Sequence, residues 1–258
     1  ADILLGTLAS TGAVSLATNG ETADATVTNA TALDLGTVTV GDNLVATATL
    51  GNITDSGVIT VGGTSSFTTA AANADIDLGT LASTGAVALS TNGGTGNATV
   101  VNATLLDFAT TGVGGNLIAT ATTGNITDSG VITVGGTSSF TTSADNQAIT
   151  LGTETNAMTG AVTFTTATAV GNTGNVLIDN GTTALDLGAS TIRGSLTATS
   201  GNAGGITDSG NVTVLGTGSF ATDANAGVIN LGTLALTGAL TLNTHTTGAA
   251  TIVNATAI

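Results

Sequence analysis

Three aspartates in a recurring Ile-Thr-Asp-Ser-Gly motif are the residues whose type and setting come closest to a chemical site. They are Asp55, Asp128 and Asp208, and carboxylates near glycine turns are ligands that calcium prefers. The sequence repeats predict that the three lie three turns apart, about 14 Å, which is too far to share one ion. The Gly-Gly-x-Gly-x-Asp pattern of calcium-binding β-rolls does not occur. We therefore expect turn capping by these carboxylates, and neither a metal nor a cofactor.

Other groups that support catalysis or nucleic-acid binding are scarce. The 258 residues contain one basic residue, Arg193, one histidine, His245, no Cys and no Tyr, against sixteen Asp and Glu, for a net charge of −15. General bases and nucleophiles are thus almost missing, and cleavage of polysaccharides needs a carboxylate pair or basic residues in a cleft. Neutralising phosphates requires clustered Lys and Arg. We expect no enzyme and no nucleic-acid partner, with Arg193 pairing with a nearby Asp.

Threonines that follow short apolar stretches are the candidates for a binding surface. Thr-x-Thr and related pairs at strand ends resemble the arrays of ice-binding solenoids, although Thr is also the commonest β-branched polar residue on any solvated sheet. If these threonines share one outward face, the chain binds a surface such as ice or glycan. The candidate residues are Thr47, Thr49, Thr68, Thr69, Thr120, Thr122, Thr141, Thr142, Thr197 and Thr199.

Asn-x-Thr acceptor sequences form a further recurring pattern. In a chain this rich in Asn and Thr several arise by chance, so they leave N-glycosylation open. They begin at Asn29, Asn52, Asn97, Asn102, Asn125, Asn180, Asn211 and Asn254.

Internal repeats predict the elements that position these residues. The segment 1–10 returns at 74–83, and the segment 51–63 returns at 124–136, both 73 residues later. A diverged third copy carries Ile206 to Gly210. The long repeats span approximately 3–75, 76–148 and 149–228, with a partial repeat at 229–258. Each contains three shorter units of 20 to 36 residues, a length typical of one solenoid coil.

Within each unit, apolar and polar residues alternate with a period of two between Gly, Asn and Asp. Val, Ile, Leu and Thr dominate, as in Thr37-Val38-Thr39-Val40, and no window has helical periodicity. Hairpin turns between successive strands are missing, so equivalent strands of successive coils are expected to pair. The sequence predicts one all-β domain over 1–258, a parallel β-solenoid of about ten coils of roughly 20–30 residues with three short strands per coil and almost no helix.

The phenylalanines and the longest units complete this picture. Phe67, Phe140 and Phe220 occupy the same place in the long repeat, and we expect them to fill one inner corner of the solenoid. The extra residues of the longest units, such as 21–29, predict an additional strand or a surface loop.

Several blocks carry a family resemblance. They are Asn116–Thr122, Gly124–Gly130, Val131–Thr137 and Ala184–Ser190. These blocks resemble the repeat region of filamentous haemagglutinin-like exoproteins, bacterial surface proteins of the two-partner secretion and autotransporter type. The resemblance implies a right-handed parallel β-helix that is exported and serves as a stalk, fibre or adhesin. The secretion domain of that family is not recognisable in this sequence.

The leading hypothesis is therefore a structural extracellular fibre or adhesin stalk. Both ends of the sequence fall inside a repeat, so we expect either flanking repeats of a longer chain or head-to-tail stacking of copies through open sheet edges. A host or environmental surface is the other expected partner. No run approaches the roughly 18 apolar residues of a membrane span, so no membrane insertion is expected. The alternative is the surface-binding solenoid with a Thr-rich face.

Overall fold

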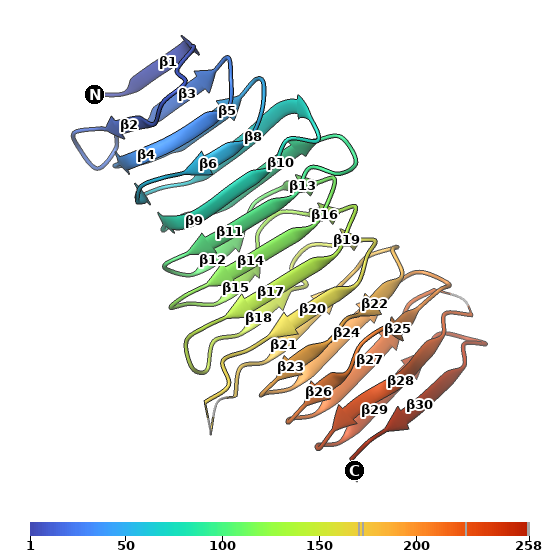
Figure 1. The fold of residues 1–258 in the computed structure, drawn as a ribbon. Coiled ribbons are helices and arrows are strands. Elements are labelled where there is room, and N and C mark those ends of the chain that lie inside the picture. The colour runs from blue at the N-terminus through green and yellow to red at the C-terminus, as the bar shows by residue number, and fades with distance from the viewer. Residues whose placement is uncertain (170, 172, 225, 257–258) are drawn as a thin grey trace.

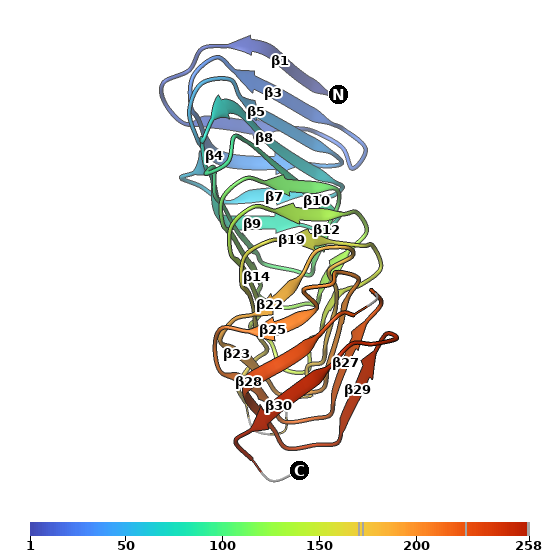
Figure 2. The same cartoon turned by 90° about the vertical axis from the view of Figure 1, so that its right-hand side faces the viewer.

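The chain winds into a rod of stacked coils with its two ends at opposite ends of the rod, as the computed structural model in Figure 1 shows. The structure describes residues 1–169, 171, 173–224 and 226–256. Figure 2, turned by 90°, shows the coils following one another from the N-terminal to the C-terminal end. Every regular element in the described residues is a β-strand, and none of them is a helix.

The strands form two sheets of 15 strands each that run the length of the rod. Sheet 1 contains β1 (Ile3–Leu8), β3 (Ala25–Asn29), β5 (Leu44–Ala48), β8 (Ser65–Ala72), β10 (Val87–Asn92), β12 (Leu106–Phe108), β13 (Thr111–Val113), β15 (Ile126–Asp128), β16 (Ile132–Val134), β18 (Ile149–Leu151), β19 (Ala157–Met158), β21 (Val176–Asp179), β24 (Leu196–Ser200), β27 (Gly218–Thr222) and β29 (Leu240–Thr244).

Sheet 2 lies on the other side of each coil. It contains β2 (Val14–Ala17), β4 (Leu33–Val40), β6 (Ile53–Asp55), β7 (Ile59–Val61), β9 (Ile76–Ser83), β11 (Ala98–Asn102), β14 (Leu117–Ala121), β17 (Ser138–Thr142), β20 (Val162–Thr165), β22 (Leu185–Leu187), β23 (Ser190–Ile192), β25 (Ile206–Asp208), β26 (Val212–Val214), β28 (Ile229–Leu236) and β30 (Ala250–Asn254).

Strands pair in parallel with the equivalent strand of the next coil. In sheet 1, for example, Leu44 lies opposite Ser65, and Ser65 opposite Val87. The chain makes about 11 turns of about 22 residues, which at about 4.8 Å per coil gives a rod about 50 Å long. The parallel β-solenoid predicted from the sequence is confirmed, with about one coil more than expected.

The coils have two sides, and the predicted three strands per coil occur where one side is split in two. Each coil gives one strand to one sheet and a longer segment to the other. The longer segment is split at a Ser-Gly corner, as between β6 and β7, or continues as one long strand, as in β9. The third strand of such a coil arises because glycine at the corner interrupts the extended backbone and divides one side into two strands.

The long repeat of 73 residues contains three and a half turns. From Ile53 the register runs through Ile76 and Ala98 to Leu117, which takes three turns within sheet 2, and Ile126 follows half a turn later in sheet 1. The segment expected as an additional strand or loop is the strand β3, and it supplies this extra half turn. Equivalent residues of successive long repeats therefore lie on opposite sides of the rod.

Aliphatic side chains and all five phenylalanines fill the space between the sheets. Phe67 and Phe220 come from sheet 1 and Phe140 from sheet 2, so the expected single inner corner is wrong, because of the half-turn offset. Phe140 contacts Phe108 across the core edge to face at 6.2 Å and stacks on Phe164 at 5.9 Å. These three rings form one aromatic cluster in the middle of the rod.

Candidate functional site

The aspartates of the Ile-Thr-Asp-Ser-Gly motif bind the backbone of the following coil. Oδ1 of Asp55 accepts from Gly79 N at 2.9 Å, and Oδ2 accepts from Thr80 N at 2.7 Å and from Thr80 Oγ1 at 2.6 Å. Asp208 makes the same three bonds with Gly232 and Thr233, at 2.8, 2.7 and 2.9 Å. The two carboxylates thus hold the bulge of the next long strand, where backbone N–H groups lack a partner in the ladder.

Asp128 serves the same purpose with different partners. Its carboxylate is 2% exposed and accepts from Thr153 N at 3.1 Å and from Asn156 Nδ2 at 2.7 Å. The three aspartates alternate between the sheets rather than lying three turns apart in one row. Among the described residues no group of three or more His, Cys, Asp or Glu is placed to hold a metal ion. Because all three carboxylates accept hydrogen bonds from the following coil, the capping predicted from the sequence links successive coils.

The candidate threonines lie on both sides of the rod instead of on one face. Thr47 and Thr68 stack in sheet 1, Thr120 and Thr141 stack in sheet 2, and β24 with Thr197 and Thr199 belongs to sheet 1 again. Thr49 and Thr122 are exposed just beyond the ends of their strands. The half-turn offset of the long repeat causes this alternation.

Two of the candidate threonines point inward. Thr69 and Thr142 are each 1% exposed, and their hydroxyls donate to the carbonyls of Ala74 at 3.1 Å and Gln147 at 3.3 Å. The expectation that they belong to an outward face is wrong, because they follow an inward Phe by two residues and side chains alternate along a strand. They close the loop that follows their strand.

One continuous column of outward threonines emerges only from the register of the coils. In sheet 2, Thr120, Thr141, Thr165, Thr191 and Thr213 lie directly over one another in five successive coils. We call this set the threonine column. Sequence reasoning missed it because three members, Thr165, Thr191 and Thr213, occur in differing contexts. The separation of the paired residues varies between 21 and 26, so no constant period reveals the column.

Four asparagines of the Asn-x-Thr sequences are parts of the core rather than free acceptors. Asn29, Asn102 and Asn180 are at most 1% exposed, and the side-chain amides of these three and of Asn254 bond the backbone of the preceding coil. Asn52, Asn125 and Asn211 are exposed. Asn97 is half-buried, and its side-chain amide donates to Asp75 Oδ1 at 3.1 Å. Of the eight acceptor asparagines, Asn52, Asn125 and Asn211 are therefore the exposed ones.

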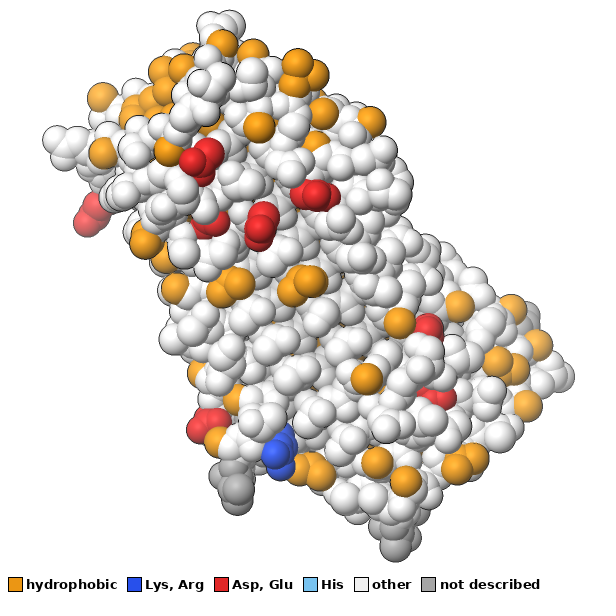
Figure 3. All heavy atoms as spheres, viewed as in Figure 1, with side chains coloured by type: hydrophobic (Ala, Val, Ile, Leu, Met, Phe, Trp, Pro, Cys, Tyr) orange, Lys and Arg blue, Asp and Glu red, His pale blue; other side chains and the backbone are white. Residues whose placement is uncertain are grey.

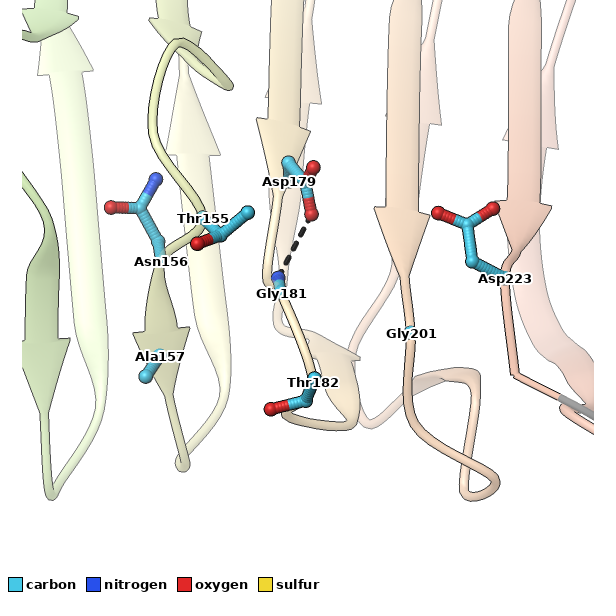
Figure 4. Close-up of a pocket in the computed structure, with 8 residues that line it drawn as sticks. All are labelled: Thr155, Asn156, Ala157, Asp179, Gly181, Thr182, Gly201 and Asp223. Carbon is cyan, nitrogen blue, oxygen red and sulfur yellow. Dashed lines mark hydrogen bonds between the residues drawn. The ribbon is translucent and has the colours of Figure 1, made fainter.

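The remaining charged residues form no reactive arrangement. Arg193 is half-buried, His245 is exposed, and within the described part of the chain neither takes part in an ion pair, so the expected pairing of Arg193 with an Asp is not found. A groove of about 400 Å³ in sheet 1 holds Asp179 and Asp223 beside Thr155 and Thr182. Figure 4 shows both carboxylates along it, with Asp179 accepting a bond from Gly181 N at 2.8 Å.

Among the described residues, no helix of the length and apolarity needed to cross a membrane occurs. The chain matches no curated protein and no protein of solved structure. The model of a family described as repeats of unknown function (DUF5649) matches three successive stretches, residues 22–93, 95–165 and 173–233, and the first two are close in length to the repeat of three and a half turns. The matched stretches cover most of the sequence, and the chain belongs to this family of repeats.

Proposed function

We propose that this chain is part of a rigid extracellular rod, a fibre or adhesin stalk of the filamentous haemagglutinin-like type. The observation that supports the proposal most is the pair of parallel ladders that run the whole length of the described chain. Because every coil hydrogen-bonds to the coil above and below, bending the rod would strain many bonds together. A solenoid of this kind keeps the same cross-section along its axis and lengthens by about 4.8 Å with each coil.

Side chains reinforce the same axial direction. Asp75 Oδ1 accepts from Asn97 N at 2.7 Å, Asn97 Oδ1 from Asn116 N at 2.9 Å, and Asn116 Oδ1 from Thr137 N at 2.8 Å. This ladder links four successive coils at one corner, as stacked Asn side chains do in other cross-β structures. Such reinforcement is of more use in a load-bearing rod than in a catalytic scaffold.

The partners we propose are flanking repeats of a longer chain or further copies stacked head to tail. In the described structure β1 pairs only with β3, β29 only with β27 and β30 only with β28, so backbone groups remain open for continued pairing. The net charge of −15 opposes lateral clumping of rods, because like-charged surfaces repel each other. Growth along the axis is thereby favoured over side-by-side association.

Electron microscopy of native material with immunogold labelling tests this proposal. We expect thin rods one solenoid wide on the outside of intact cells. Compact particles, or label confined to the cell interior, would refute the stalk. Sedimentation of the 258-residue chain over a hundredfold range of concentration tests head-to-tail stacking separately, because stacking raises the sedimentation coefficient with concentration.

The threonine column supports a second candidate function, binding to a surface outside the cell. It is regular along the axis, but its neighbouring outward column contains Ile118, Ser139 and Thr163. Ice presents a lattice regular in two directions, so this surface favours a glycan over ice. Thermal hysteresis at millimolar protein tests ice binding directly, and we expect none.

A further inference from the structure

Two grooves recur at equivalent places on sheet 2. The first has a volume of about 220 Å³ and is lined by Val58, Thr80, Ala82, Val101 and Ala103 among others. The second has a volume of about 300 Å³, and its lining includes Thr213, Thr233, Ala235, Val253 and Ala255. Both lie where a long strand, β9 or β28, is followed by the shorter strand β11 or β30. The grooves are therefore a product of the repeat and not an accident of one loop.

The threonine column joins these two grooves. Val101 of the first groove lies opposite Thr120, the first member of the column. The last member, Thr213, lines the second groove and lies opposite Ala235, which lines it too. Six coil-to-coil steps of about 4.8 Å separate Val101 from Ala235, so the track is about 29 Å long.

The residues that line this track carry no negative charge themselves, and the nearest carboxylates, Asp55 and Asp208, are engaged by Thr80 and Thr233. No Asp or Glu lines either groove. None occurs within two residues of any member of the threonine column, where Arg193 is the only charged residue. In the view of Figure 3, several acidic side chains lie over the N-terminal part and others towards the edges of the C-terminal half, and the centre of the face shown carries none. The equivalent groove in sheet 1 contains Asp179 and Asp223. A ligand of the track need not be cationic.

The hydroxyls of the track are available to a ligand. Within the described part of the chain, the side chains of the five column threonines make no hydrogen bond, and all five are partly exposed. In contrast, the hydroxyls of Thr80 and Thr233 are occupied by Asp55 and Asp208. Each column threonine thus offers one methyl group and one hydroxyl group to a ligand. At the two ends of the track, the grooves add side chains of Val and Ala.

We propose that this track binds one chain of a neutral, linear polysaccharide lying along the rod axis, with its ends seated in the two grooves. Sugar rings present hydroxyls and apolar C–H faces in alternation, which match the threonine hydroxyls and the methyl groups of Val and Ala. An extended peptide would need a free strand edge for its backbone, and the track lies on the face of a sheet. This inference rests on the second candidate function, the surface-binding role.

Filling one groove tests the proposal. Ala103 and Ala255 are exposed groove residues at equivalent positions, so A103W and A255W each fill one groove without entering the core. The matched control is A70W, which alters an exposed alanine of sheet 1. Calorimetry would use cello-oligosaccharides of three and of eight units, a soluble neutral β-glucan, and alginate as the anionic probe.

We expect the octasaccharide to bind at least about tenfold more tightly than the trisaccharide, because only the longer chain reaches both grooves. A103W or A255W should reduce the octasaccharide affinity to that of the trisaccharide, and A70W should leave it unchanged. T141V with T165V, which keep the side-chain shape and remove two hydroxyls, should weaken binding at least about threefold, because hydrogen bonds to the ligand are lost. Circular dichroism of each variant verifies the fold.

Three results would overturn the proposal. They are no binding of any neutral glycan, equally tight binding of alginate, and affinity unchanged in both tryptophan variants. A neutral Gly-Ser peptide bound in the grooves in place of the glycans would assign the track to a peptide. The wider surface-binding function would be refuted separately, if the double variant T141V/T165V attached to every tested surface as well as the unaltered chain does. The proposal of an extracellular rod is tested only by the electron microscopy described above.

Discussion

The side-chain amide of Asn102 pairs with the backbone of Ser83 as if it were a peptide group of the next coil. Oδ1 accepts from Ser83 N at 2.8 Å, and Nδ2 donates to Ser83 O at 2.9 Å. The same pairing joins Asn29 to Ser10, Asn180 to Met158 and Asn254 to Leu236. Each asparagine thus pairs with the backbone at or just beyond the end of a strand in the preceding coil.

The substitution N102A is expected to lower the free energy of unfolding by about 1–3 kcal/mol, because it leaves the buried N–H of Ser83 without a partner. The carbonyl of Ser83 still accepts from Thr104 Oγ1 at 2.7 Å. Urea denaturation monitored by circular dichroism measures the change. The control N211A removes an exposed amide and should cost less than about 0.5 kcal/mol. Equal losses in the two variants would contradict the pairing as a source of stability.

The length of the repeat can be predicted from the sequence, but the side of the rod on which each strand lies cannot. The alternation of apolar residues and the 73-residue repeat were enough to predict parallel coils, because stacking is the way such strands bury their apolar faces. The half turn escaped prediction because Ala25–Asn29 has the pattern of any short strand. Only its pairing with β1 and β5 shows that it crosses to the other side.

The candidate surface was predictable only in part for the same reason. The sequence alone does not show which of two adjacent threonines points outward. Thr68 and Thr69 both lie in β8, and only the alternation of side chains along the strand places Thr68 outward and Thr69 inward. The column through Thr165 and Thr191 depends on pairing across 26 residues, which no constant period reveals. The sequence predicts a capping role for Asp55, whereas its partners in the next coil are known only from the register.

Removing the carboxylate of Asp55 tests the capping between coils. D55A should destabilise the chain by about 1–3 kcal/mol, because the N–H groups of Gly79 and Thr80 lose a charged acceptor. D55N retains one acceptor oxygen and should lose less. Thermal unfolding of both variants beside D145A, which alters an exposed carboxylate, measures the difference. A loss in D145A as large as in D55A would argue against a specific cap.

Calcium should have no effect on stability. The oxygens of Asp55 and Asp208 are already engaged by backbone and hydroxyl donors of the next coil. An ion would have to break these bonds before it could bind. We expect identical melting temperatures in millimolar calcium chloride and in excess chelator. A calcium-dependent rise in the melting temperature that D55A removes would reassign this carboxylate as a ligand.

Glycine at one corner of the coil is required by the close approach of the coils. A Cβ at Gly114 would overlap the carbonyl oxygen of Gly93 in the previous coil, whereas a Cβ at Gly112 meets nothing within 4 Å. G114A is therefore expected to cost about 1–3 kcal/mol through forced backbone shifts, and G112A close to zero. Denaturation midpoints of G114A and G112A measure this difference in stability for the same substitution at two positions two residues apart. Equal midpoints would mean that the corner can widen freely.

The aromatic cluster should make Phe140 more sensitive to substitution than Phe220. Both rings are fully buried, but Phe140 contacts Phe108 and Phe164, whereas Phe220 has no ring partner among the described residues. F140L and F220L remove the same ring and leave similar volume, so their common transfer cost cancels in the comparison. Each aromatic pair is worth about 0.5–1.5 kcal/mol beyond burial, and F140L should therefore be the less stable by about 1–3 kcal/mol. Urea midpoints of the two variants measure this difference. A larger loss in F220L would show that cavity formation at that level, and not contact between rings, governs the stability of the core.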